Sequence, residues 1–185
     1  MVAFPDPNLE AAIREALSKA SEPIYTSELA GLLSLSASSR GIQDLSGLEY
    51  CTSLSGLSLW GNLISDISPL RDLTNLTELL LYTNQISDIS LLANLSNLTH
   101  LCLQGNQIRD VSPLANLTNL ISLDLELNQI SDVSPLANLA NLTHLYLGEN
   151  QISDISSLAG PTGLTYLELQ GNAISDILPL ANLII

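Results

Sequence analysis

Residues 98–119 read LTHLCLQGNQIRDVSPLANLTN, and residues 120–141 read LISLDLELNQISDVSPLANLAN. These are the clearest copies of a 22-residue unit that occurs six times without an insertion or a deletion. Each unit has an asparagine eight residues after its first leucine, and the units open at Leu54, Leu76, Leu98, Leu120, Leu142 and Leu164. A repeat of this length predicts a solenoid, in which each unit is one coil that packs against its neighbours.

Seven positions of the unit are apolar, and their spacing indicates the local structure of each coil. Leu101 and Leu103 alternate as in a β-strand, whereas the later apolar positions are three residues apart, which favours 3₁₀ turns. Stacked coils can share one core, in which each buried leucine contributes roughly 1.5–3 kcal/mol. In the third unit the apolar residues are Leu98, Leu101, Leu103, Ile108, Val111, Leu114 and Leu117.

Three polar positions of the unit are predicted to satisfy backbone groups. The asparagine at position 9, Asn106 in the third unit, is expected to bond its own turn and the next coil. Ser112, which precedes Pro113, is expected to cap a short helical turn. The aspartate at position 13, Asp110 in this unit, is predicted to accept backbone N–H groups in the turn. A cation bound along the column of these aspartates is the alternative.

The pattern LxxLxLxxNxI within 22 residues resembles the leucine-rich repeat, and its form SDISPLANLTN resembles the bacterial internalin-like subclass. The resemblance covers residues 54–185. It implies an α/β fold, a leucine-rich repeat solenoid shaped as a right-handed horseshoe. Its parallel β-sheet would lie on the concave side, with 3₁₀ or irregular structure on the convex side.

Residues 1–31 do not repeat and are predicted to form an N-terminal helical cap. Asp6 and Pro7 favour the start of a first helix, and a second is expected from Thr26 to about Leu32. The segment FPDPNLEAAIREAL at 4–17 resembles the helical cap of internalins. Residues 32–53 are predicted to be a degenerate first repeat, followed by six full repeats in 54–185.

The last unit ends in Leu183, Ile184 and Ile185, where the other units are more polar. Solenoids need a polar closing element to remain soluble. We therefore expect a fragment or a contact with another domain. The predicted state is a monomer, or self-association through the uncapped C-terminal end.

Composition excludes several classes of partner. The net charge is −14 with only five basic residues, which argues against nucleic acid and anionic membrane surfaces. The sequence has no apolar run that predicts membrane insertion and no recognisable signal peptide. Cys51 and Cys102 fall at different places in the unit, so no disulfide is predicted. Family resemblance implies a secreted or cell-surface location.

Positions 3, 5, 7 and 8 are predicted to point outward from the concave sheet, and they differ between units. Aromatic residues, which anchor many protein interfaces, share this face with acidic residues and with no lysine or arginine. The predicted ligand-binding residues are Trp60, Glu78, Leu80, Tyr82, His100, Gln104, Asp124, Glu126, Tyr146, Glu149, Tyr166 and Glu168.

A nucleophilic site of His100, Cys102 and Asp124 is a weaker interpretation of the same face. An open, regular sheet provides neither a pocket nor free backbone N–H groups for an oxyanion. A metal between His100 and His144 would have ligands about 10 Å apart, across two strands, which zinc does not allow. The sequence therefore predicts no catalytic residue, no metal site and no cofactor.

The pattern as a whole favours a non-catalytic protein–protein interaction module that binds a protein ligand on its concave face. Resemblance to internalins implies a bacterial surface or secreted protein. The alternative is an intracellular regulatory scaffold that resembles phosphatase-binding leucine-rich repeat proteins of the same repeat length.

Overall fold

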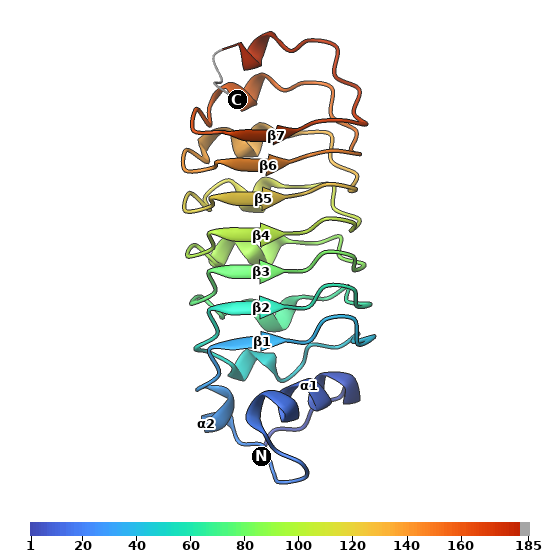
Figure 1. The fold of residues 1–185 in the computed structure, drawn as a ribbon, viewed down its shortest axis with the longest axis vertical. Coiled ribbons are helices and arrows are strands. Elements are labelled where there is room, and N and C mark those ends of the chain that lie inside the picture. Colours follow the sequence, from blue (N-terminus) through green and yellow to red (C-terminus); the bar gives the residue numbers. More distant parts are fainter. Residues whose placement is uncertain (182–185) are drawn as a thin grey trace.

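The computed structural model describes residues 1–181, and Figure 1 shows a stack of coils that begins at two helices. Each coil contributes one three-residue strand, and the seven strands form one parallel sheet in chain order. Neighbouring strands pair so that equivalent positions lie side by side, as Leu79 does with Leu101. The predicted leucine-rich repeat solenoid is confirmed. The strands are β1 (Ser34–Ser36), β2 (Gly56–Ser58), β3 (Glu78–Leu80), β4 (His100–Cys102), β5 (Ser122–Asp124), β6 (His144–Tyr146) and β7 (Tyr166–Glu168).

The apolar positions of the units form one core that runs through the stack. In the third unit all seven apolar side chains are at most 2% exposed, as the pattern predicts. In the last unit Leu167, Leu169 and Ile174 are only partly buried. The predicted apolar end at residues 183–185 lies outside the described part of the chain.

The asparagine at position 9 holds adjacent coils together. Asn128 donates from Nδ2 to the carbonyls of Leu125 in its own coil and Leu103 in the preceding coil, at 3.1 and 3.0 Å. Its Oδ1 accepts the N–H of Ile108 at 3.0 Å. The predicted bonding to its own turn and to a neighbouring coil is confirmed, with one correction: the neighbouring coil is the preceding one and not the next.

The turns before the 3₁₀ helices correct the capping prediction. Ser112 is the first residue of its helix, and Val111 is at the cap position. The backbone N–H of Ser112 donates to Asp110 Oδ1 at 2.8 Å. All seven aspartates at position 13 accept the N–H two residues later, which confirms their predicted role in the turn. The helices are η1 (Leu48–Tyr50), η2 (Ser68–Leu70), η3 (Ser90–Asn94), η4 (Ser112–Leu114), η5 (Ser134–Asn138), η6 (Ser156–Ala159) and η7 (Leu178–Leu180).

Two helices precede the sheet. α1 (Pro7–Leu17) begins after Asp6, whose Oδ1 accepts the N–H groups of Asn8 and Leu9. The other carboxylate oxygen of Asp6 accepts the N–H groups of residues 43 and 44, which fastens α1 to the first coil. α2 (Thr26–Leu29) ends earlier than predicted, because Gly31 and Leu32 bond to carbonyls three residues back and so tighten the last turn.

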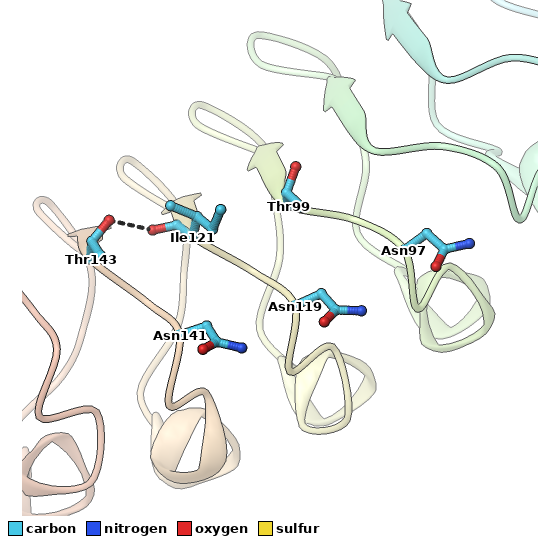
Figure 2. Close-up of a pocket in the computed structure, with 6 residues that line it drawn as sticks. All are labelled: Asn97, Thr99, Asn119, Ile121, Asn141 and Thr143. Atoms are coloured by element: carbon cyan, nitrogen blue, oxygen red, sulfur yellow. Dashed lines mark hydrogen bonds between the residues drawn. The ribbon is translucent and has the colours of Figure 1, made fainter.

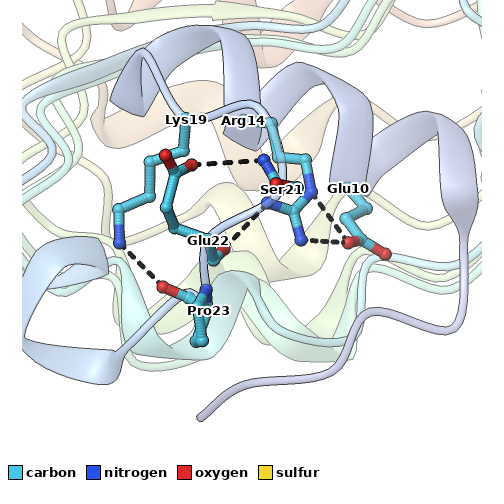
Figure 3. Close-up of polar contacts among 6 residues, drawn as sticks. All are labelled: Glu10, Arg14, Lys19, Ser21, Glu22 and Pro23. Atoms are coloured by element: carbon cyan, nitrogen blue, oxygen red, sulfur yellow. Dashed lines mark hydrogen bonds and ion pairs between the residues drawn. The ribbon is translucent and has the colours of Figure 1, made fainter.

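The helical segment contains two of the five basic side chains of the chain, Arg14 and Lys19. Figure 3 shows Arg14 donating to Glu10 and to the backbone carbonyl of Glu22, and Lys19 donating to the carbonyl of Pro23. Arg40 of the first coil forms an ion pair with Glu15 of α1 at 2.5 Å. These contacts pair the basic side chains at the N-terminal end of the stack with carboxylates and backbone carbonyls. Within residues 1–181 no helix is long and apolar enough to cross a membrane.

Candidate functional site

The outward side chains of the strands and of the two residues after them form one surface, which we call the strand face. Strand alternation creates it: Leu79 is buried in the core, while Glu78 and Leu80 on either side point away. The predicted residues at positions 3, 5 and 7 lie on this face, and none of them is fully buried. They are Trp60, Glu78, Leu80, Tyr82, His100, Gln104, Asp124, Glu126, Tyr146, Tyr166 and Glu168.

Aromatic rings gather at two places on the strand face. Trp60 and Tyr82 are stacked, with ring centroids 5.2 Å apart and planes 5° apart, and we call them the aromatic pair. Tyr166 lies 5.1 Å from Tyr146 and 6.0 Å from His144, and these three form the tyrosine cluster. The sequence prediction missed His144 as a member, although it occupies the same column as Tyr166.

Acidic side chains lie between and beside the aromatic groups. Glu126 accepts from Gln104 Nε2 at 2.6 Å and from Gln170 Nε2 at 3.0 Å, so that one amide holds each carboxylate oxygen. Glu168 accepts the hydroxyl of Tyr166. Asp124 lies in register with Tyr146 of the next strand. The acidic part of the face is therefore joined to the tyrosine cluster.

Gly148 makes the contact between Gln170 and Glu126 possible. A Cβ at Gly148 would lie 2.4 Å from Gln170 Nε2 and 3.0 Å from Glu126 Oε1. The missing side chain leaves the path along which Gln170 reaches across one coil. Gln170 was not predicted as a site residue, since nothing in its own unit indicates a partner two units away.

A thiol and a carboxylate contact each other at the centre of the face. Cys102 Sγ donates to Asp124 Oδ2 at 3.4 Å, and burial raises the pKa of the Cys102 thiol to about 12. Burial, together with the charges of Glu126 and Glu168, raises the pKa of Asp124. His100 Nδ1 pairs with the Thr99 hydroxyl at 3.0 Å. A thiol with so high a pKa is a poor nucleophile at neutral pH.

Position 8 has a backbone conformation that differs from that of the strands. Thr83, Leu127 and Glu149 have φ values of 56°, 55° and 55°, which place them in left-handed turns after the strands. Glu149 packs beside Gly171, where a Cβ would lie 2.4 Å from its Oε1. Leu127 is 51% exposed. Glu149 and Leu127 therefore follow the strands in turns, and their place in a binding surface stays a prediction.

Two of the hollows on the surface of the stack lie near the strands. The one on the strand face has a volume of about 190 Å³ and is lined by residues of β1 and β2 together with Glu78 and Leu80 of β3. The larger one, of about 490 Å³, lies on the flank (Figure 2). Its Asn97, Asn119 and Asn141 each donate to a carbonyl of the preceding coil, so the flank hollow is lined by scaffold bonds.

The comparisons with known proteins agree with this geometry. The family described as Leucine Rich repeats (2 copies) matches residues 52–94, 74–116, 96–138 and 118–160. A solved internalin (inlF) from Listeria monocytogenes is 41% identical with a TM-score of 0.82, over 97% of this chain and 60% of that chain. An internalin C2 from the same organism is 42% identical with a TM-score of 0.78, over 97% of this chain and 90% of that one.

A more distant solved structure is a plant peptide hormone receptor, RGFR1, in complex with RGF2. It is 27% identical with a TM-score of 0.61, over 68% of this chain and 22% of that chain. A comparison with curated protein sequences gives no significant match. The repeat, its register and the two internalin structures lead to one conclusion: the chain belongs to the leucine-rich repeat family, as a bacterial internalin-like protein–protein interaction module.

Proposed function

We propose that the strand face binds a protein ligand, and that Trp60, Tyr82, Tyr146 and Tyr166 are its main anchors. The single observation that carries the proposal is the gathering of aromatic rings on the one surface that varies between otherwise repeated units. Tyrosine and tryptophan contribute large contact areas at low entropic cost, and they dominate the binding energy of many interfaces. The face is open, so it suits a protein surface better than a small molecule.

The proposal includes the organisation of the chain. Residues 1–31 would serve as the helical cap, residues 32–53 as a degenerate first repeat, and residues 54–185 as the repeats that present the binding surface. A cap that is fixed to the first coil is supported by the ion pair between Arg40 and Glu15 and by the bonds that Asp6 accepts from the N–H groups of residues 43 and 44.

We further propose that the protein acts at the bacterial surface or after secretion. The similarity to two internalins of Listeria monocytogenes supports this location. Protease treatment of intact cells of the source bacterium would test it. Digestion of the protein on intact cells, or its recovery from the medium, is expected; protection until lysis would contradict it.

The binding proposal is tested by capture of surface-displayed protein libraries on the immobilised chain. A variant carrying Trp60→Ala, Tyr82→Ala and Tyr146→Ala is run in parallel. Tyr50→Ala is the matched control, because Tyr50 is 41% exposed and lies in η1, away from the strand face. Ligands kept by the control and lost by the triple variant are expected, whereas ligands kept by both would place the site elsewhere.

A further inference from the structure

We propose, resting on the strand-face function above, that the partner presents an extended basic segment. Two apolar side chains of this segment bind the aromatic pair and the tyrosine cluster, and arginine side chains between them bind the carboxylates of Asp124 and Glu126. The inference adds the chemistry and the spacing of the partner to the surface proposed above.

The positive charge expected of the partner follows from which charged side chains of this chain already form ion pairs. Arg14 pairs with Glu10 at 2.7 Å, and Lys19 pairs with Glu28 at 2.6 Å. Arg40 also pairs within the N-terminal part, with Glu15. Among the described residues, no ion pair neutralises a carboxylate of the strand face. A partner with basic side chains is therefore attracted to an uncompensated acidic surface.

The geometry around Glu126 favours arginine over lysine as the basic side chain of the partner. Gln104 and Gln170 each occupy one position on its two oxygens, which fixes the carboxylate before a ligand arrives. Each oxygen retains acceptor capacity, because an ionised carboxylate has about four lone-pair sites. A planar guanidinium can use both oxygens at once and stack on neighbouring tyrosine rings, which an ammonium group cannot do equally well.

The environment of Asp124 adds a second reason for a cation at this place. Its carboxylate lies in register with Tyr146, and Cys102 donates a weak bond to one oxygen. Glu126 and Glu168 lie near enough to raise its pKa, after burial. A guanidinium placed here would offset the repulsion among the three carboxylates and would favour ionised Asp124.

The spacing of the anchors follows from the strand register. The aromatic pair is centred between β2 and β3, and Tyr146 and Tyr166 are centred between β6 and β7. Four strand intervals separate the two centres across the sheet, which corresponds to about 19 Å measured perpendicular to the strands. A fully extended chain covers that distance in about six residues. Asp124 and Glu126, in the coil of β5, lie between the anchors.

The probe is a synthetic peptide of about twelve residues, with two phenylalanines about six residues apart and two arginines between them. Trp60 is the only tryptophan of the chain, so its fluorescence reports occupation of the aromatic pair directly. A second peptide has glutamate in place of both arginines. A third lacks the phenylalanine meant for the tyrosine cluster.

We expect the arginine peptide to bind at least about tenfold more tightly than the glutamate peptide. Glu126→Gln should weaken arginine-peptide binding at least about fivefold, because it removes a charge-assisted pair. Asp72→Asn is the matched control, since it removes one exposed charge in a turn, and it should leave affinity unchanged. Tyr146→Ala should weaken the two-anchor peptide and leave the one-anchor peptide unaffected. Circular dichroism confirms that each variant is folded.

Equal affinity for the arginine and glutamate peptides, or unchanged affinity in Glu126→Gln, would overturn the inference. Failure of every peptide to change Trp60 emission would overturn it as well. None of these outcomes decides the strand-face function, because the triple aromatic variant tests that function against captured protein ligands. A captured ligand that depends on the aromatic residues but not on Glu126 would retain the function and reject the basic segment.

Discussion

Asn128→Ala should destabilise the protein far more than Asn119→Ala, which changes an exposed asparagine at the end of a unit. Asn128 is buried and supplies the only side-chain partner described for the N–H of Ile108, at 3.0 Å. Removing it leaves that buried N–H unpaired, which costs about 1–3 kcal/mol. It also removes donated bonds to Leu103 and Leu125, each worth about 0.5–1.5 kcal/mol.

The loss of the donated bonds is partly compensated. The carbonyl of Leu103 still accepts from Asn106 at 2.9 Å, and that of Leu125 still accepts from Asn150 at 2.9 Å. The free energy of unfolding should therefore fall by roughly 3 kcal/mol, with the unpaired N–H as the largest part. Asn119→Ala is the matched control, because Asn119 is exposed and donates one bond to the carbonyl of Ser96. Its cost should be below about 1 kcal/mol.

Urea unfolding followed by circular dichroism measures both free energies, and Trp60 fluorescence provides a second probe. Trp60 lies in the first full unit and Asn128 in the fourth, so separate transitions would mean that the array unfolds in two parts. Equal destabilisation by Asn128→Ala and Asn119→Ala would refute the reasoning, because the buried N–H of Ile108 would then carry no particular cost.

Three further predictions concern the turns and the acidic centre of the face. Leu127→Gly should raise stability by about 1 kcal/mol in thermal unfolding, because glycine removes the left-handed strain at φ 55°, and Leu127→Ala should give no such gain. Asp124→Asn should raise Tm near neutral pH. The raised pKa of Asp124 means that the native state holds its proton more tightly, so ionised Asp124 lowers stability above that pKa, and the difference should vanish below the ordinary value of 3.8. Cys102, whose thiol pKa is raised to about 12, should react with iodoacetamide at neutral pH much more slowly than an unstructured cysteine peptide, as followed by mass spectrometry.

The sequence allowed the fold to be predicted because every determinant of the fold is periodic. The columns of leucine, asparagine and aspartate recur at one spacing, and each column corresponds to one level of the core or one type of turn bond. The capping prediction at Ser112 was wrong because the aspartate column and the serine column can both serve the backbone of this turn. Asp110 accepts the N–H of Ser112, two residues later, and the capping prediction considered Ser112 and Pro113 without Asp110.

The details of the strand face were less accessible from the sequence. That position 8 is left-handed could have been recognised, since its column contains Gly61, Gly105 and Gly171, all with positive φ. The contact between Gln170 and Glu126 could not, because it depends on side-chain conformations and on the absence of a Cβ at Gly148 in the intervening unit. The repeat specifies which side chains share a face, but only the structure shows which of them are in contact.

The separation of scaffold bonds from the strand face explains how such a protein can change its partner. Buried asparagines bond backbone groups of their own and the preceding coil, and turn aspartates bond their own turns. Outward positions 3, 5 and 7 contribute no apolar residue to the fully buried core. Substitutions at exposed outward positions should thus change stability by no more than about 0.5 kcal/mol while they change binding. Glu126, Gly148 and Gln170 are the exception, because a change at any one of them alters the other two. Binding specificity in this chain can therefore vary one unit at a time where outward side chains do not touch, but only jointly at the stacked aromatic pair and around Glu126.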